Sequence, residues 1–384
     1  MTMNTSETKI IIAGDFIPCD NNMELFKHDD ASHIFGSEIC HLFASADFSI
    51  VNLEGTLTNS QEKQTKIGPA IKAEKETIKG IKALGVTAVA MANNHVTDYG
   101  EQGILDTFEV LEANGISHVG AGRNISDINT HLSLLNSRIC IYNVSEQFFN
   151  SPSETTPGVN LYDEYVVCNE IRELKKYHEY VIVIYHGGAE LFPYPTPLTR
   201  KRFHRMADCG ADIVTAQHTH CIGCEEWYKG SYLLYGQGNF LFSRQATRPM
   251  NMEGLVLEVI LDNGLIIKKH RVELNKEACL QYSSDQSLID FYNRSKEIDD
   301  SEMILKKYTK LKSDNIIERY LLAYKGNCFW LKKFKRFIPN QMYKRLLYSY
   351  SSGDILRNRF TLLSERANED IYYMWQQILD NKSF

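Results

Sequence analysis

The sequence predicts an α/β fold followed by a C-terminal helical extension, and three observations lead to this prediction. Between residues 10 and 272, short β-branched and apolar runs alternate with segments whose apolar residues recur at helical spacing. Such alternation indicates helices packed on sheets. Several of the apolar runs end in polar side chains able to bind metals, and strand patterns stop beyond Ser283. We therefore expect a first domain over 1–282 and a helical, basic region over 283–384.

The expected elements follow from the two periodicities. Strand-like runs of β-branched and apolar residues occupy 9–13, 48–51, 86–90, 139–143, 181–185 and 212–216. Helical spacing occurs over 74–84, 100–114 and 198–209. A β-rich stretch follows, at 225–227, 232–234, 253–261 and 265–274. The Ser-, Thr-, Pro- and Asn-rich segment 145–163 and the Pro-rich segment 192–199 are expected to be loops.

Composition excludes several protein classes. The 384 residues are 43% hydrophobic and 23% charged, which excludes disordered and collagen-like chains. The longest apolar stretches, such as 181–185, are far shorter than the roughly 18 residues that span a bilayer. The first nine residues lack the basic start and apolar block of a secretory signal. We therefore expect a soluble, cytoplasmic protein.

The charge indicates which partners to expect, and the cysteine content indicates the compartment. The net charge is −6, but residues 291–384 carry an excess of basic side chains, so the remainder is strongly acidic. An acidic core repels phosphate backbones, and we expect no nucleic-acid partner. Nine cysteines, an odd number, favour free buried thiols in a reducing compartment. Cys221 and Cys224 form a Cys-x-x-Cys pair with three interpretations: a separate zinc site, a redox pair or two buried thiols.

Polar, metal-competent side chains follow five of the expected strands. They are Asp15, Glu54, Asn94, His95, His186, His218 and His220. Each has an ordinary alternative, because a Gly-Asp after a strand is usually a turn and a single histidine can be hydrogen-bonded in a core. Since ligands collect at the carboxyl edge of α/β sheets, and alternate residues of an extended His-x-His face one side, the set together predicts one shared site.

The chemistry of these side chains favours a transition metal. Mixed carboxylate, imidazole and amide ligands suit Mn, Fe or Zn rather than Ca. Two ions about 3.5–4 Å apart that share one carboxylate form a clamp for in-line attack on phosphorus. A histidine outside the ligand set can then protonate the leaving oxygen. We expect one or two divalent ions.

The order and spacing of these motifs resemble the CapA-type capsule (poly-γ-glutamate) synthesis proteins, a branch of the calcineurin-like metallophosphoesterase fold. The matching segments are 12–18 (IAGDFIP), 47–58 (DFSIVNLEGTLT), 90–103 (AMANNHVTDYGEQG), 115–124 (GISHVGAGRN), 183–190 (VIYHGGAE), 210–220 (GADIVTAQHTH) and 235–242 (YGQGNFLF). The resemblance covers about two thirds of the chain. It implies a metallophosphoesterase-like α/β/β/α sandwich with a C-terminal helical extension.

The resemblance also implies a role for each site residue. Asp15 and His220 would bind the first metal, Glu54 would bridge, and Asn94, His186 and His218 would complete the second. His95 would be the proton donor, with Asp98 orienting its imidazole. The side chains expected to contact substrate are Asn93, Glu190, Asn239 and Arg244.

The sequence departs from the family pattern at four points. The broader phosphoesterase pattern has a histidine two residues after the first Asp, where this chain has Ile17, so the first metal keeps only Asp15, Glu54 and His220. Gly187 replaces an aromatic residue and Gln217 replaces a glycine. Many relatives begin with a membrane anchor, which this chain is expected to lack.

Two functions from different classes are compatible with these observations. The first is a metal-dependent phosphoesterase-like hydrolase in capsule, exopolysaccharide or related envelope-polymer biosynthesis. The second is a non-catalytic polymer-binding or assembly subunit of a capsule synthesis machinery, which the missing histidine at Ile17 favours. Amide chemistry on a glutamate-like polymer is a third option, but it lacks a dedicated nucleophile. The expected partner is an anionic polymer or a phosphorylated envelope intermediate, and Arg123, Arg200, Lys201 and Arg202 lie near motif loops that could meet it.

The segment 325–348 interleaves basic and aromatic residues and has no acidic residue. One interpretation is a helical subdomain that packs its aromatic side chains and leaves its charges in water. The other is peripheral contact with the anionic cytoplasmic face of the membrane, where each Lys or Arg adds roughly 1 kcal/mol.

Overall fold

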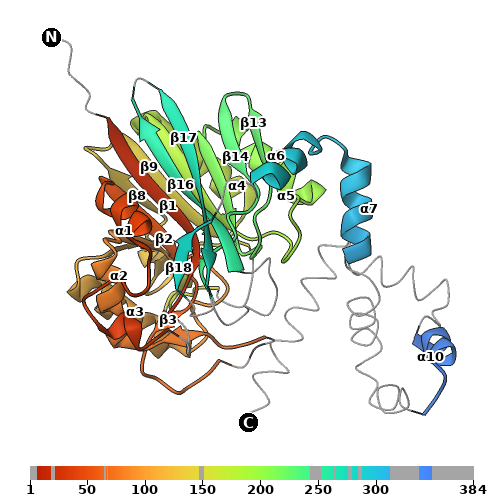
Figure 1. Ribbon diagram of the computed structural model, residues 1–384, viewed down its shortest axis with the longest axis horizontal. Helices are drawn as coiled ribbons and strands as arrows, with labels where there is room; N and C mark the ends of the chain where they lie inside the picture. Colours follow the sequence, from red (N-terminus) through yellow and green to blue (C-terminus); the bar gives the residue numbers. More distant parts are fainter. Residues whose placement is uncertain are drawn as a thin grey trace. The chain divides into compact units, whose positions relative to one another are not determined.

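Two large β-sheets form the centre of the structure, a computed structural model (Figure 1). It describes residues 7–18, 22–64, 66, 68–146, 151–242, 252–262, 264–275, 279–283, 288–311 and 337–347. The chain divides into two units, 1–308 and 309–384. The domain boundary predicted between 282 and 283 stays a prediction.

The first sheet has eight strands in the order β18-β17-β16-β1-β2-β5-β6, with β15 also paired to β1. Strands β1, β2, β5, β6 and β15 run parallel, and β16, β17 and β18 extend the sheet antiparallel. The bounds are β1 Thr8–Phe16, β2 Phe48–Leu53, β5 Ala88–Ala90, β6 Ser117–Val119, β15 Asn239–Leu241, β16 Glu253–Leu261, β17 Leu265–Leu274 and β18 Leu280–Tyr282.

The second sheet has six strands in the order β13-β14-β12-β11-β9-β8. Its four central strands are parallel and its two edge strands are antiparallel. The bounds are β8 His131–Leu134, β9 Ile139–Ser145, β11 Tyr180–His186, β12 Ile213–Gln217, β13 Glu225–Tyr228 and β14 Ser231–Leu234. Two small ribbons pair β3 (Thr56–Leu57) with β4 (Lys72–Ala73) and β7 (Ala121–Gly122) with β10 (Gly158–Val159).

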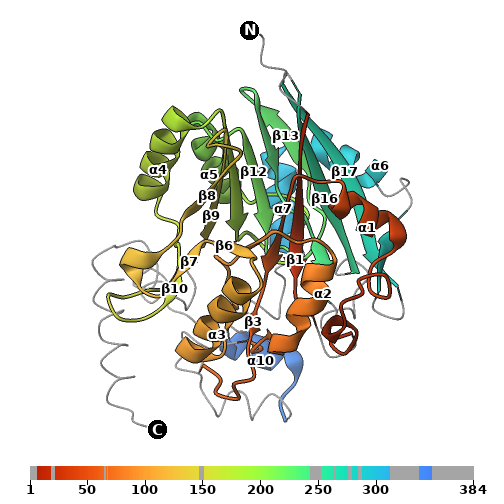
Figure 2. The same ribbon diagram turned by 90° about the vertical axis from the view of Figure 1, so that its left-hand side faces the viewer.

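Helices cover the outer faces of both sheets, as Figure 2 shows. Helices α1 (Ser37–Ala44), α2 (Ile78–Ala83) and α3 (Gly100–Ala113) pack on the first sheet, and α4 (Glu164–Tyr177) and α5 (Pro197–Asp208) on the second. The remaining helical elements are α6 Leu288–Lys296, α7 Ser301–Leu311, α10 Asn340–Leu347 and the 3-10 turns η1 Leu25–Lys27, η2 Lys75–Thr77 and η3 Ile125–Asp127.

Three apolar clusters explain why the layers stack in this way. Ile10 and Ile12 of β1 face Ile182 and Ile184 of β11 between the sheets, whereas Ile11 points to the helices on the outer face. This alternation is the period-2 pattern of a strand. Because both faces are covered, the central strands are continuous apolar runs. The predicted α/β/β/α sandwich is confirmed.

The structure contains two helices and several strand ends that the sequence analysis did not anticipate. Helices α1 and α4 were not predicted, although Asp163 accepts a hydrogen bond from the backbone N–H of Val166 as an N-cap and was a usable signal. Strand β1 continues to Phe16 because Asp15 pairs with Asn239 of β15 and with Asn52 of β2. Asp15 therefore lies within a strand rather than beyond it.

The structure describes only part of the C-terminal segment for which membrane contact was considered. No helix among the described residues is both long and apolar enough to cross a bilayer. Of the basic and aromatic segment 325–348, the structure describes 337–347, which includes α10. Residues 325–336 and 348 lie outside the described residues, so both interpretations of this segment stay predictions.

Candidate metal centre

The predicted ligands come together where the carboxyl ends of the parallel strands of both sheets meet. Asp15 comes from β1, and Glu54 directly follows β2. His186 ends β11, and His218 directly follows β12. Asp15, Glu54 and His186 have no solvent-exposed surface. The fold therefore places several ionisable side chains in one buried volume, where water cannot solvate them.

One group consists of Asp15, Glu54 and His220, whose potential ligand atoms all lie within 4.8 Å of one another. His220 Nδ1 lies 3.2 Å from Asp15 Oδ2, and its Nε2 lies 3.8 Å from Glu54 Oε1. The imidazole thus sits between the two carboxylates. This is the set that the resemblance assigned to the first metal.

The second group consists of Glu54, His186 and His218, again with ligand atoms within 4.8 Å of one another. His186 Nε2 lies 3.7 Å from Glu54 Oε1 and 2.8 Å from Asn94 Oδ1. The Asn94 side chain therefore reaches the same point. Because Glu54 belongs to both groups, the arrangement matches two ion sites that share one carboxylate.

The surroundings of the Glu54 carboxylate show whether the residues of the two groups fit a metal ion. Neither of its oxygens has a hydrogen-bond partner among the residues that the structure describes. An unpaired buried carboxylate is strongly unfavourable. Burial and the charge of Asp15 raise the pKa of Glu54 well above its usual value. A divalent cation would supply the missing interaction, so the donor set fits the metal that the family implies.

The histidines carry different charges in the metal-free protein. Burial and the neighbouring His218 and His220 hold the pKa of His186 well below its usual value, which keeps its ring neutral. Burial alone would lower the pKa of His220, but the Glu54 and Asp15 carboxylates raise it to about 10. A proton on His220 therefore offsets part of the negative charge. Metal binding would displace that proton, since metals bind the neutral ring.

Asn52 links the two groups, and the sequence analysis did not identify it. Its Nδ2 lies 2.8 Å from Asp15 Oδ1 and 3.1 Å from His186 Nδ1. Its Oδ1 accepts a hydrogen bond from Nδ2 of Asn93 at 3.2 Å. Asn52 lies in β2, and Glu54, two residues further on, directly follows the strand, so a continued period of two puts both side chains on the same side. This two-residue period was the signal in the sequence from which Asn52 could have been identified. Asn93, predicted to contact substrate, is buried and also donates to the carbonyl of Leu53.

The other predicted substrate contacts have different positions. Asn239 Oδ1 accepts a hydrogen bond from His220 Nδ1 at 2.8 Å, which turns the ring's Nε2 toward Glu54. Glu190 is more exposed, and its Oε1 lies 3.7 Å from His218 Nε2. Arg244 lies outside the described residues. Asn239 is thus placed to orient a ligand, in the way that partners of metal-binding histidines commonly do.

His95 and Asp98 form a hydrogen-bonded pair beside the ligands. His95 Nδ1 lies 2.7 Å from Asp98 Oδ2, and His95 Nε2 lies 4.0 Å from Glu54 Oε1. Burial lowers the pKa of His95, and the Asp98 carboxylate opposes this. Lys66, whose side chain is 5% exposed, forms an ion pair with Asp98 and donates to the Asn94 carbonyl at 3.2 Å. Lys66 was not predicted, because nothing in its loop sequence marks it as buried.

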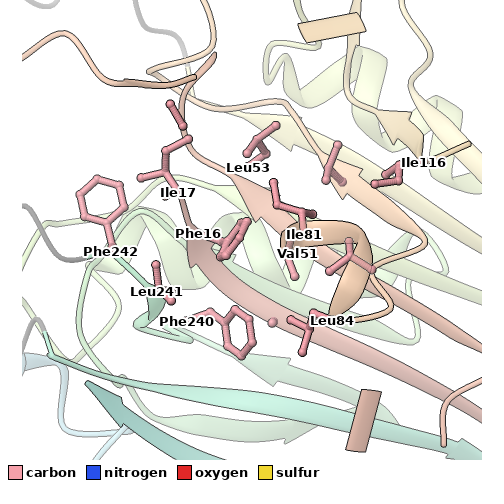
Figure 3. Close-up of a cluster of buried hydrophobic side chains, with 14 of the residues drawn as sticks. Phe16, Ile17, Val51, Leu53, Ile81, Leu84, Ile116, Phe240, Leu241 and Phe242 are labelled. Carbon is pink, nitrogen blue, oxygen red and sulfur yellow. The ribbon is translucent and has the colours of Figure 1, made fainter. Parts of the chain in front are cut away.

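Ile17, which stands where the broader pattern has a histidine, is a packing residue. It has no exposed surface and belongs to the apolar cluster on the outer face of the first sheet. Figure 3 shows it among Phe16, Leu241 and Phe242. Its side chain offers no ligand atom, so the Asp15 group offers three potential ligands rather than four.

The arginines near the motif loops are held in ion pairs within the protein. Arg123 pairs with Glu112, Arg200 with Glu226 and Asp299, and Arg202 with Glu146. Lys201, on the same helix as Arg200 and Arg202, is exposed to solvent. Each of the three arginines therefore has a carboxylate partner within the protein.

Cys221 and Cys224 are buried free thiols. Burial raises the pKa of each to about 12, so both are protonated. Within the described part of the chain, neither belongs to a group of side chains able to hold a metal. This arrangement matches the interpretation as two buried thiols.

Comparison with known proteins shows the family to which the chain belongs. The sequence model of the family described as "Bacterial capsule synthesis protein PGA_cap" matches residues 9–244, more than half of the chain. The chain belongs to this family. The family prediction made from the motifs is therefore confirmed. Every ligand of the two groups lies inside the matched range.

Similar proteins match part of this chain. It is 31% identical over 214 residues to the PGA biosynthesis protein CapA of Bacillus subtilis (strain 168), covering 54% of this chain and 56% of that protein. It is 30% identical over 205 residues to the capsule biosynthesis protein CapA of Bacillus anthracis, covering 51% and 50%. The matched residues thus span about half the length of these relatives. A hypothetical protein of known structure from Thermus thermophilus aligns with TM-score 0.42 at 14% identity, over 68% of this chain and 99% of that chain.

Proposed function

We propose that this chain is a metal-dependent, phosphoesterase-like hydrolase that serves the synthesis of a capsule, an exopolysaccharide or a related envelope polymer of the poly-γ-glutamate type. Its family membership supports the biosynthetic role, and the paired ligand groups support the chemistry. The substrate class that suits both the biosynthetic role and the metal-dependent chemistry is an anionic polymer or a phosphorylated envelope intermediate.

One observation carries the proposal more than any other. Glu54 is fully buried, its oxygens have no hydrogen-bond partner among the described residues, and it is shared by two ligand groups. An ionised carboxylate in this position is unfavourable, and a bound divalent cation would compensate its charge in both groups at once. A side chain that served packing alone would not need this charge.

The residues of the centre divide into holding and proton-transfer roles. Asp15, Glu54 and His220 would hold one Mn, Fe or Zn ion, and Glu54, Asn94, His186 and His218 would hold a second. Such ions stabilise charge on phosphoryl oxygens and activate water for in-line attack. His95 would deliver a proton from Nε2 to the leaving oxygen, while Asp98 holds its Nδ1.

The proposal is tested by metal analysis combined with turnover. Protein purified without chelator is reconstituted with Mn²⁺ or Zn²⁺, its metal content is measured, and hydrolysis of an activated phosphodiester is followed. We expect one or two ions per chain and metal-dependent hydrolysis. Reconstituted protein that retains no ion would contradict the proposal. The variant Glu54→Gln serves as the matched control, because it keeps the shape and removes the charge.

A second candidate function is a polymer-binding or assembly subunit without catalysis. The observation that favours it is Ile17, which leaves the Asp15 group one ligand short and lies in an apolar cluster. This alternative predicts retained metal without hydrolysis of any phosphoester, and binding of anionic polymer that does not depend on His95. The same reconstituted protein distinguishes the two functions.

We also propose peripheral contact of 325–348 with an anionic membrane surface at the cytoplasmic face, which would bring the centre close to envelope intermediates. The basic and aromatic composition of this segment supports it. Sedimentation with anionic and neutral vesicles tests it. We expect salt-sensitive binding to anionic vesicles only, lost on deletion of 325–348. Equal recovery in the supernatant with both vesicles at low salt would contradict it.

A further inference from the structure

The loop that carries His218 and His220 has an unusual backbone. His218 has φ 85° and His220 has φ 51°, both in the left-handed region that residues with a side chain rarely adopt. Such conformations persist only where the surrounding structure holds them. Residues 218–223 are called here the His loop. The contacts that hold this loop therefore determine the orientation of the two proposed ligands, His218 and His220.

One side of the His loop is held by backbone packing within the family domain. Gly223 N–H donates to the Gly236 carbonyl at 3.0 Å, and Leu191 N–H donates to the Thr219 carbonyl at 2.8 Å. A Cβ added at Gly223 would lie 2.9 Å from the Gly236 nitrogen, so the two chains approach as closely as glycine allows. These contacts leave the carbonyls of residues 222 and 223 facing away from that side.

The other side is held by α6, which lies outside the family domain. Arg294 Nε donates to the Gly223 carbonyl at 3.0 Å, and its Nη2 donates to the Ile222 carbonyl at 3.1 Å. Two residues beyond the His loop, the Glu225 N–H donates to Ser295 Oγ at 3.0 Å. The helix itself is anchored by Phe291, which has no exposed surface and lies in the cluster between the sheets.

We propose that Arg294 is a positioning residue of the metal centre: by clamping two successive carbonyls of the His loop, it keeps His218 and His220 in their ligand-forming orientation. The inference rests on the proposed metal centre. Arg294 lies beyond the family match at 9–244 and beyond the predicted domain at 1–282. A site whose ligands all belong to the family domain thus depends on a helix outside it.

The chemistry of arginine suits this role. Its planar guanidinium presents several N–H groups in a fixed fork, so it can bind two neighbouring carbonyls at once. Lysine can replace the charge but not the fork. Glutamine at 294 is too short to reach both carbonyls and carries no charge. Loss of the clamp frees residues 222 and 223, and the two positive-φ histidines upstream can then relax away from Glu54.

The test is metal affinity, measured on the full chain by isothermal titration with Mn²⁺. We expect Arg294→Gln to weaken Mn²⁺ binding by about 10- to 100-fold, the usual effect of removing support behind metal ligands. Arg294→Lys should lie between Arg294→Gln and the wild type. The Co²⁺-loaded variants should also show altered visible absorption, because the ligand geometry changes while the ligands are all present.

Arg200→Gln is the matched control. Arg200 also donates to a backbone carbonyl, that of Ile298 at 3.1 Å, and pairs with Glu226 and Asp299. Its contacts brace the same helical region without touching residues 218–223. We expect this variant to lower the thermal stability of the metal-free protein and to leave Mn²⁺ affinity and the Co²⁺ spectrum unchanged.

The outcomes separate this inference from the function on which it rests. A wild-type protein that binds no Mn²⁺ overturns the metal centre itself. Wild-type binding with equal affinity in Arg294→Gln overturns only the role of Arg294. Equal weakening in Arg294→Gln and Arg200→Gln would also overturn it, because the effect would then be general packing. If Arg294→Gln does not fold, Arg294→Lys against Arg200→Lys decides the question.

Discussion

Asp98 Oδ2 lies 2.7 Å from His95 Nδ1, and this contact turns the opposite ring nitrogen toward the shared carboxylate of Glu54. Asp98 is itself fixed, since it also accepts a hydrogen bond from the Ile71 backbone N–H at 2.7 Å and pairs with Lys66. The orientation of His95 is therefore determined by three chain segments. A ring held this firmly is suited to proton transfer at one defined atom.

His95→Asn is expected to lower phosphodiester turnover by about 10²- to 10⁴-fold, the usual contribution of a positioned proton donor. Metal content should stay at the wild-type level, because His95 belongs to neither ligand group. Turnover and metal content are measured on the same preparation. A variant with full activity on every substrate that the wild type cleaves would show that the proton comes from another group.

Glu54→Gln is expected to abolish retention of both ions, because the shared carboxylate contributes to both groups. The metal-free variant should unfold at a temperature at least as high as metal-free wild type, since glutamine keeps the shape of the side chain and cannot carry a charge for which the described residues provide no hydrogen bond. Metal analysis and thermal unfolding in chelator measure the two effects. Retention of two ions would exclude Glu54 as the bridge.

Asn239→Leu is expected to weaken metal binding at the Asp15 group by about 10- to 100-fold. The change removes the acceptor that orients His220, while the number of side-chain heavy atoms is unchanged. Stepwise titration with Mn²⁺ should show one weakened and one unchanged site. The control is His218→Asn, which should weaken the other site. Two unchanged sites in Asn239→Leu would leave Asn239 as a substrate contact only.

Ile17→Ala is expected to lower the free energy of unfolding by about 2–5 kcal/mol, the range for truncating a fully buried aliphatic side chain. Metal affinity should be unchanged, because Ile17 packs in the apolar cluster and offers no ligand atom. Chemical denaturation of the metal-free protein gives the first quantity, and Mn²⁺ titration gives the second. A large loss of affinity with little loss of stability would contradict the packing role.

Metal removal is expected to destabilise the protein. An ion that binds only the folded state stabilises it by RT ln(1 + [L]/Kd), or about 2.7 kcal/mol when the free concentration is 100 times Kd. The unfolding temperature should therefore fall on addition of chelator and recover with Mn²⁺. The unfolding temperature of Glu54→Gln should change neither on addition of chelator nor on addition of Mn²⁺. A chelator effect of equal size in that variant would show that the ion acts elsewhere.

The strand cores and most ligands could be predicted from sequence because the signals are local. Covered β-strands of a sandwich are continuous apolar runs, and polar residues at their carboxyl ends stand out against them. Asp15, Glu54, His186 and the His-x-His were identified in this way. Helix α4 was missed because the preceding loop composition dominated, although its cap at Asp163 was present.

Residues that support the centre could not be predicted in the same way. Lys66 and Arg294 look like ordinary surface charges in sequence, and each contacts groups that lie far away along the chain. Asn239 was expected to contact substrate, and its hydrogen bond to His220 was not predicted. Such roles depend on which distant backbone groups face each side chain, and no local pattern encodes that.

The sequence by itself determined the α/β architecture, the family and the set of candidate ligands, because hydrophobic periodicity and motif spacing are properties of short segments. Only the tertiary structure decided that Asn52 links the two ligand groups and that the His loop is clamped from α6. The physical reason is distance. Ligation and hydrogen bonding require atoms within a few ångströms, and the packing of two sheets brings those atoms together from opposite parts of the chain.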